Sequence, residues 1–190
     1  DASWSDHWKI CGWLLLAVDG SKFECPRTQQ NEEKLSGKAL KTPQIFQTTV
    51  LHIPTGLPWD FEVGPGLESE RRQFDRLLPS LPEDAMVVAD AGFISFALCQ
   101  SLMRSNRSFV FRVAANMHLV EGLSSSCPKL ECMAGCDLTC LWPKEDSDQQ
   151  PVVLRRVTVR NAIGQPVALV TNVLDPNKLS DADLLQIYRH

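Results

Sequence analysis

Two apolar runs of the chain are each followed directly by an aspartate. The first run, Trp13 to Val18, precedes Asp19, and the second run, Met86 to Ala89, precedes Asp90. Short runs without polar residues are typical of strands that are buried on both faces of a sheet. The pattern therefore predicts two buried strands, each with an acidic residue at its carboxyl end.

The residues around these runs predict further elements. Gln44 to Ile53 alternates polar and apolar positions, and Leu57 to Val63 returns as a second strand after a short turn. Two stretches of helical spacing and one more strand complete this part of the chain, and they cover Glu68 to Leu78, Ile94 to Met103 and Ser108 to Val113. The predicted order is β-β-β-α-β-α-β. This order indicates an α/β fold in which helices pack on a mixed sheet.

The character of the sequence changes beyond residue 115. The stretch up to residue 150 is polar, irregular and rich in cysteine. Val152 to Val159 and Pro166 to Val173 are strand-like, and the residues between them suit a hairpin turn. Ser180 is a typical N-cap for a C-terminal helix. We therefore expect three parts, which are a sheet with helices over 1–115, a β-rich insertion over 116–174 and a helix beside the sheet over 175–190.

Composition and charge narrow the function classes. Of the 190 residues, 44% are hydrophobic and 22% charged, as in ordinary globular proteins, and the formal net charge is −4. This charge excludes a histone-like protein but leaves open a DNA enzyme with a local basic surface. The longest apolar run, Ile10 to Val18, is shorter than the about 20 residues of a membrane-spanning helix. We expect no membrane association, and because the chain begins at Asp1 we expect a piece of a longer protein.

Seven cysteines, an odd number, favour reduced thiols over a complete set of disulfides. Four of them are closely spaced, with three to four residues between neighbours, at Cys127, Cys132, Cys136 and Cys140. Zinc sites usually have tighter pairs with two residues between the cysteines. A structural zinc ion and small buried side chains within the insertion are both open interpretations.

Asp19 and Asp90 are the main candidates for chemistry. A carboxylate next to a buried strand is usually paired, hydrogen-bonded or bound to a metal ion, because an unpaired buried charge is costly. If the two strands are neighbours, the two carboxylates could hold Mg²⁺, which takes few protein carboxylates and keeps waters and phosphate oxygens as its other ligands. Two such ions can promote phosphodiester hydrolysis. The alternative is that both aspartates simply begin turns beside Gly20 and Gly92.

Arginines give two stretches a local positive charge. The later stretch, residues 152–174, contains Arg155, Arg156 and Arg160 and no acidic residue. In a strand, Arg156 and Arg160 would share one face. Such a row could follow the phosphates of DNA, or it could be an ordinary solvated strand face.

Several separated segments resemble one family of bacterial proteins. They read L-L-L-A-V-D-G-S from Leu14, T-G-L-P-W-D from Thr55, V-V-A-D-A-G-F from Val87 and T-N-V-L-D-P from Thr171, the last followed by L-S-D-A-D-L-L-Q-I-Y-R-H. In this order they resemble the catalytic core of IS4-like DDE transposases of insertion sequences. The resemblance covers nearly the whole chain. It implies an RNase H-like fold with a β-rich insertion between the second and third acidic residues.

The resemblance also implies roles for particular residues. Asp19 and Asp90 match the first two catalytic acidic residues, which would bind Mg²⁺ or Mn²⁺. Tyr188 matches the tyrosine of the motif Y-x2-R-x3-E-x6-K, and we count it with the three arginines among the DNA-binding candidates. The motif's arginine and its catalytic glutamate would fall beyond His190. The family's N-terminal DNA-binding portion is absent as well.

These observations lead to two main hypotheses. The first is a transposase core that hydrolyses phosphodiesters and transfers strands at transposon ends, and that is inactive in this form because the third acidic residue lies beyond His190. It implies double-stranded DNA as partner, a homodimer of the intact protein and a place in the bacterial cytoplasm beside the nucleoid. The second is a non-catalytic DNA-binding or zinc-stabilised relic of such an enzyme. An unrelated RNase H-like nuclease is a further alternative.

Overall fold

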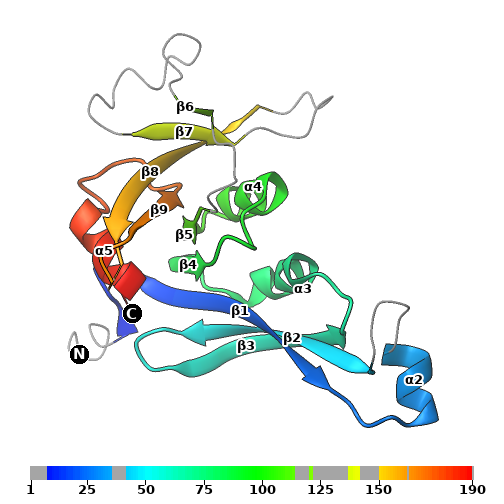
Figure 1. Cartoon of the computed structure of the whole chain (residues 1–190). Helices are drawn as coiled ribbons and strands as arrows, with labels where there is room; N and C mark the ends of the chain where they lie inside the picture. The colour runs from blue at the N-terminus through cyan, green and yellow to red at the C-terminus, as the bar shows by residue number, and fades with distance from the viewer. Residues whose placement is uncertain are drawn as a thin grey trace.

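The computed structural model describes residues 8–35, 42–113, 120–121, 137–141, 150–161 and 163–189. Within these residues, nine strands form one sheet in the order β3-β2-β1-β4-β5-β9-β8-β7-β6 (Figure 1). The strands are β1 Leu14–Glu24, β2 Gln44–His52, β3 Leu57–Pro65, β4 Ala85–Ala89, β5 Ser108–Arg112, β6 Val120–Glu121, β7 Leu138–Leu141, β8 Val152–Arg160 and β9 Pro166–Thr171.

The first five strands have the arrangement that the sequence predicts. β3, β2 and β1 form an antiparallel meander, and β1 continues into parallel pairing with β4, which is in turn parallel to β5. This is a mixed sheet of the RNase H-like type. The two apolar runs lie in its middle as β1 and β4, and Leu15, Leu16 and Met86 are each fully buried.

The sheet continues beyond β5 without a break. β9 pairs antiparallel with β5, and β8 pairs antiparallel with β9. The described part of 116–174 is therefore β-rich as expected, but β8 and β9 extend the central sheet, where we expected an insertion apart from it. The physical reason is that β5 would otherwise leave an open edge, which β9 covers with backbone hydrogen bonds. As a division into domains, 1–115, 116–174 and 175–190 stays a prediction.

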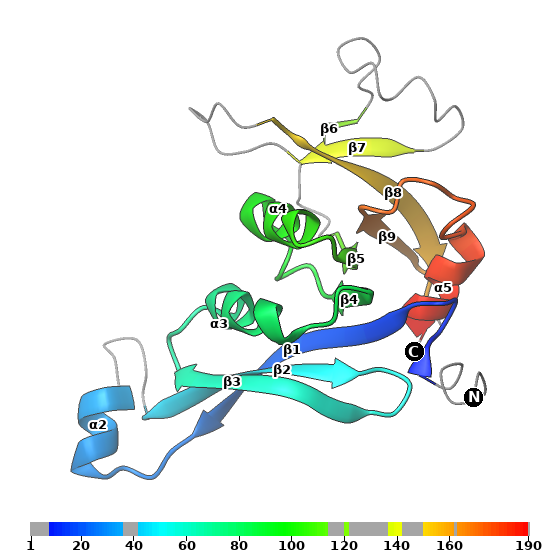
Figure 2. The same ribbon diagram turned by 180° about the vertical axis from the view of Figure 1, so that it is seen from behind.

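Helices cover both faces of the sheet (Figures 1 and 2). α3 (Glu70–Leu77) and α4 (Phe96–Arg104) pack on one face through Phe74 and Leu98, in a cluster with Leu16 of β1. α5 (Asp181–Arg189) packs on the other face, where Leu184 lies in a cluster with Leu15. Neighbouring residues of a strand point to opposite faces, so β1 contributes to both clusters. Two short helices complete the described chain, α2 (Gln29–Leu35) and the 3₁₀ helix η2 (Leu78–Ser80).

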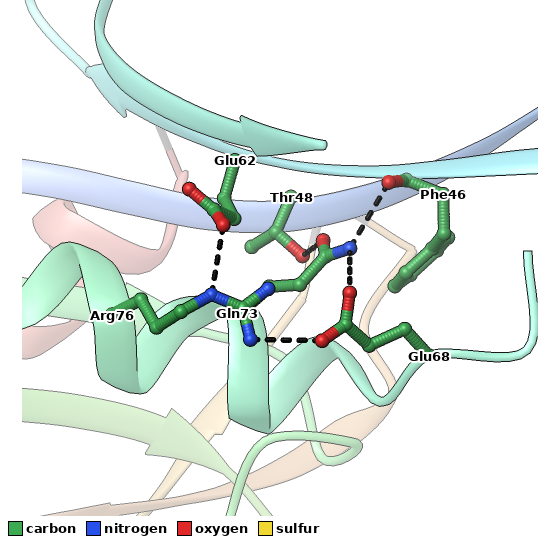
Figure 3. Close-up of polar contacts among 6 residues, drawn as sticks. All are labelled: Phe46, Thr48, Glu62, Glu68, Gln73 and Arg76. Carbon is green, nitrogen blue, oxygen red and sulfur yellow. Dashed lines mark hydrogen bonds and ion pairs between the residues drawn. The ribbon is translucent and has the colours of Figure 1, made fainter. Parts of the chain in front are cut away.

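A buried glutamine attaches α3 to the meander (Figure 3). Gln73 is fully buried, accepts a hydrogen bond from Thr48 Oγ1 at 2.7 Å and donates to the carbonyl of Phe46 and to Glu68, each at 3.1 Å. Arg76, one turn further along the helix, donates to Glu62 and Glu68, each at 2.8 Å. Because all polar atoms of the Gln73 amide have partners, α3 is fixed in both position and rotation on β2 and β3. This fixes its first turn beside β1 and the carboxyl end of β4.

Candidate active site

The structure places Asp19 and Asp90 side by side. β1 and β4 are adjacent and parallel, and Val18 is paired in register with Ala89. Asp19 is the next residue of β1 and Asp90 directly follows β4, so the two residues occupy neighbouring positions, and both side chains are exposed. The prediction that the first strand ends at its aspartate is wrong, because β1 continues to Glu24 and stays paired with β2 over these residues.

Each aspartate is oriented by a nearby backbone amide, for Asp19 within β1 and for Asp90 in the loop that follows β4. Asp19 Oδ1 accepts a hydrogen bond from the amide of Gly20 at 2.8 Å, and Asp90 Oδ1 accepts one from the amide of Gly92 at 2.7 Å. Within the described residues neither Oδ2 atom has a hydrogen-bond partner. The turn role that the sequence left as an alternative therefore holds for Asp90, whereas Asp19 and Gly20 lie within β1 and begin no turn. One oxygen of each carboxylate stays open to a ligand.

A third carboxylate, which the sequence analysis missed, lies close to this pair. Glu70 begins α3, and its carboxylate packs against Gly20, where an added Cβ would stand 2.6 Å from Glu70 Oε1. Burial raises the pKa of the Glu70 carboxyl above its ordinary value, and the negative charges of Asp90 and Asp19 raise this pKa further. In the sequence, Glu70 looks like an ordinary acidic residue in the first turn of a helix. Its position depends on the docking of α3 and could not be derived from a local pattern.

The neighbouring residue, Arg71, contacts the loop of the second aspartate. Its Nε and Nη2 atoms donate to the carbonyl of Gly92 at 2.8 and 2.5 Å. The first turn of α3 thus reaches the neighbours of both aspartates, through Glu70 at Gly20 of β1 and through Arg71 at Gly92 of the loop after β4.

Tyr188 and Asp90 line one cavity of about 300 Å³ between the sheet and α5. Arg112, at the end of β5, also lines it, and the rest of the wall is mostly apolar and includes Val88 and Ile187. The resemblance predicts a functional role for Tyr188, and the structure places it in the wall of the same cavity as the second aspartate. The sequence did not indicate Arg112 as a site residue.

The structure contradicts a DNA contact for Arg155. This side chain is 1% exposed, donates through Nη2 to the carbonyl of Leu179 at 2.5 Å and lies 3.9 Å from Asp181. Arg155 shares its strand face with Val157 and Val159, and that face is turned toward the C-terminal segment and α5. A guanidinium enclosed in this way cannot reach a phosphate, so Arg155 stabilises the fold instead.

Arg156 and Arg160 lie on the opposite face of β8. Arg160 is exposed and donates to the carbonyl of Gly164 at 2.8 Å, whereas Arg156 is half-buried. Their role in DNA binding stays a prediction.

The donor set of the two aspartates fits a hard divalent cation. Two carboxylates with one open oxygen each match Mg²⁺, which is usually bound by one or two protein carboxylates together with waters and phosphate oxygens. Among the described residues, no group of three or more His, Cys, Asp or Glu side chains could hold a metal ion. The structure therefore gives no support for the zinc site. Cys140 is buried in β7, and Cys127, Cys132 and Cys136 lie outside the described residues.

Within the described part of the chain, none of the helices is long and apolar enough to cross a membrane.

The fold and the site together define a class of protein. A mixed RNase H-like sheet with aspartates at neighbouring positions on two adjacent parallel strands is the framework of metal-dependent enzymes that act on phosphodiesters. The transposase DDE domain family matches residues 14–190, and the chain belongs to this family. The resemblance to IS4-like DDE transposases is therefore confirmed.

The chain is also similar to individual transposases. The chain is 22% identical over 193 residues to the transposase InsG for insertion sequence element IS4 of Escherichia coli (strain K12), and this match covers 97% of the chain and 42% of the relative. The chain thus spans less than half the length of that relative. A solved structure, the piggyBac transposase synaptic complex with hairpin DNA, is 11% identical with a TM-score of 0.49, covering 92% of this chain and 37% of that one.

Proposed function

We propose that this chain is the catalytic core of a DNA transposase that cleaves phosphodiesters at transposon ends and transfers the freed strand to target DNA. One observation carries the proposal, which is the register of β1 and β4 that puts Asp19 and Asp90 at neighbouring positions with exposed side chains. Membership of the transposase DDE domain family supports it. Strand transfer, the DNA sequences recognised and the identity of the metal ion belong to the proposal.

Asp19 and Asp90 would hold Mg²⁺ or Mn²⁺ through their open Oδ2 atoms. A divalent cation in such a site supplies Lewis-acid stabilisation of the phosphodiester oxygens and lowers the pKa of bound water. The task of the protein is to keep the two carboxylates oriented, which the amides of Gly20 and Gly92 do through Oδ1. Arg112 and Tyr188 share the cavity of Asp90 and would contact the phosphate or sugar next to the scissile bond.

The family resemblance implies three carboxylates that bind the catalytic metal ions. By that resemblance the third is a glutamate seven residues after Tyr188, at a position beyond His190. We infer that this form of the chain binds metal weakly and cleaves DNA poorly. Without the third carboxylate the site has less negative charge to bind the cation and fewer groups to position it at the scissile phosphodiester. The intact protein would act on double-stranded DNA as a homodimer, in the cytoplasm beside the nucleoid of a bacterium.

The competing hypothesis is a non-catalytic DNA-binding relic. Its supporting observation is that the described residues contain no group of three acidic, histidine or cysteine side chains suited to a metal ion. The two hypotheses differ in whether the adjoining coding sequence supplies the arginine and glutamate of the motif, or a stop codon.

Cleavage of transposon-end DNA by the extended chain tests the proposal. The extension would run through the expected glutamate and include the N-terminal DNA-binding portion. Asp19→Asn and Asp90→Asn keep the oxygen that accepts the amide hydrogen bond but remove the charge that would bind the cation. We expect each to lower the cleavage rate by roughly a thousandfold or more.

Asp84→Asn is the matched control for these variants. Asp84 precedes β4, whereas Asp90 follows it, and it makes an exposed ion pair with Lys9 at 2.9 Å. Such pairs contribute about 0–1 kcal/mol, so this variant should cleave like the unsubstituted protein. Equal, metal-independent cleavage by all three variants would refute the proposed function.

A further inference from the structure

Arg71 of α3 is hydrogen-bonded to the loop that carries Asp90. Both of its hydrogen bonds end on the carbonyl oxygen of Gly92, and the amide of the same glycine donates to Asp90 Oδ1. Gly92 is therefore held at both of its peptide units. Gly92 therefore connects the guanidinium of Arg71 to the carboxylate of Asp90.

Within the loop, the amide of Phe93 also donates to the carbonyl of Asp90 at 3.3 Å, but this bond does not restrain the carbonyl of Gly92. An added Cβ on Gly92 would stand 3.0 Å from Asp90 Oδ1, so a stiffer residue would crowd the carboxylate. Glycine leaves the backbone more freedom than any other residue. Phe93, the residue after Gly92, anchors the end of the loop. Its side chain is 1% exposed and packs edge-on against Phe74 of α3, with the two ring centroids 6.0 Å apart. The carbonyl of Gly92 is held by Arg71.

We propose that Arg71 is a positioning residue for the reaction: its two hydrogen bonds to Gly92 set the direction in which the Asp90 carboxylate faces the cation and the scissile phosphodiester. The inference rests on the proposed function. Arg71 itself contacts neither metal nor DNA in this scheme. It acts through the backbone of the loop.

The geometry requires arginine and not merely a positive charge. Nε and Nη2 form a planar fork, and both atoms donate to one oxygen, which restrains the direction of the carbonyl as well as its distance. Lysine offers a single charged nitrogen on a flexible stem. Arg71→Lys thus keeps the charge near the acidic site and removes the restraint.

Binding of Mn²⁺ to the 190-residue chain tests the inference without requiring cleavage. The free Mn²⁺ concentration would be followed by electron paramagnetic resonance during titration. We expect Arg71→Lys to weaken binding by roughly 10- to 100-fold, the usual loss when a residue that orients a metal ligand is changed. Arg72→Lys is the matched control, because Arg72 is the next residue, is exposed and, in the described structure, makes no hydrogen bond to this loop.

The cleavage kinetics of the extended chain distinguish a positioning role of Arg71 from a simple loss of protein stability. Arg71→Lys should raise the Mg²⁺ concentration needed for half-maximal cleavage and lower kcat, leave KM for DNA unchanged and leave the thermal midpoint within the range of Arg72→Lys. Mn²⁺, which is less strict in its geometry, should restore part of kcat.

The possible outcomes separate the two claims. If Asp19→Asn and Asp90→Asn abolish Mn²⁺ binding while Arg71→Lys binds it like Arg72→Lys, the role of Arg71 is wrong and the proposed function stands. If the two aspartate variants bind Mn²⁺ as well as the unsubstituted chain, the proposed function fails, and the role of Arg71 fails with it.

Discussion

The glycine after Asp19 leaves room for two side chains of other elements. A Cβ at Gly20 would stand 2.5 Å from Cζ of Phe46 and 2.6 Å from Oε1 of Glu70. The Phe46 ring is 3% exposed and packed, whereas the Glu70 carboxylate is the end of a flexible side chain. At this one position the absence of a side chain lets the first turn of α3 lie against β1. Gly20 thereby contributes to the acidic site without any polar atom of its own.

Gly20→Ala should therefore destabilise the protein. The added methyl group must displace the Phe46 ring, and overpacking of this kind costs about 1–3 kcal/mol. For a chain of this size each kcal/mol lowers the thermal midpoint by about 2–4 °C. Ser21→Ala, on the exposed next residue, should stay within about 0.5 kcal/mol of the unsubstituted protein. Equal thermal midpoints for the two variants would show that the Phe46 ring does not confine this position.

At the scale of elements, α5 owes its start to a pair of side chains that cap it reciprocally. The amide of Asp183 donates to Ser180 Oγ at 3.1 Å, while the amide and hydroxyl of Ser180 donate to Asp183 Oδ2 at 2.9 and 2.7 Å. This is the capping box, with aspartate in place of the usual glutamate. Because α5 carries Tyr188, the cap also fixes one wall of the cavity at Asp90.

Ser180→Ala should lower the free energy of unfolding by about 1 kcal/mol at pH 7. The hydrogen bonds from Ser180 hold the pKa of Asp183 below its ordinary value. A carboxyl whose pKa is lower in the folded state stabilises the fold above its unfolded pKa of about 3.9, and this contribution is lost as the pH falls through the folded pKa. The difference between the two proteins in urea unfolding should therefore shrink as the pH falls below about 4.

Lys178→Ala is the control for the cap, because Lys178 is exposed and lies two residues before Ser180. It should have the same free energy of unfolding as the unsubstituted protein both at pH 7 and at pH 3. A constant stability difference for Ser180→Ala from pH 7 to pH 3 would contradict the contribution of the charged Asp183.

At the scale of the whole molecule, the periodicity of apolar residues was sufficient to predict the central strands and helices. The strands β2 to β5, β8 and β9 and the helices α3, α4 and α5 fall within a few residues of the predicted ranges, because each has a periodic apolar pattern. β1 continues to Glu24, six residues beyond its predicted end, and the short strands β6 and β7 lie in a stretch for which no strand was predicted. α2 has no such pattern: none of its residues is buried, and polar contacts such as the bond between Arg27 and Glu32 at 2.8 Å hold it. The polar stretch that contains it therefore predicted no helix.

The candidate site was predictable in part for the same reason. Asp90 follows a buried strand and Asp19 follows the buried half of β1, so their placement could be derived from local pattern. The burial of Arg155 could also have been derived, because the alternation that puts Arg156 and Arg160 on one face puts Arg155 with Val157 on the other. Glu70 and Arg71 depend on how α3 docks on the sheet through Gln73, and a contact between distant segments leaves no periodic signal.

Arg156 and Arg160 allow a test of DNA binding by the molecule as a whole. A chain with net charge −4 must bind DNA through local basic surface, and binding of this kind weakens with salt by a slope of about 0.9 per phosphate contact. Replacing both arginines by glutamine in the extended chain should weaken binding to all duplexes alike and reduce the salt slope by about 1.8. Arg27→Gln is the control, because Arg27 pairs with Glu32 beside α2, near the end of the sheet away from β8 (Figure 1). Filter binding from 50 to 200 mM salt measures the slopes. If the double variant kept the slope of the control, the predicted phosphate contacts of this strand face would be wrong, and the duplex would have to lie on another face.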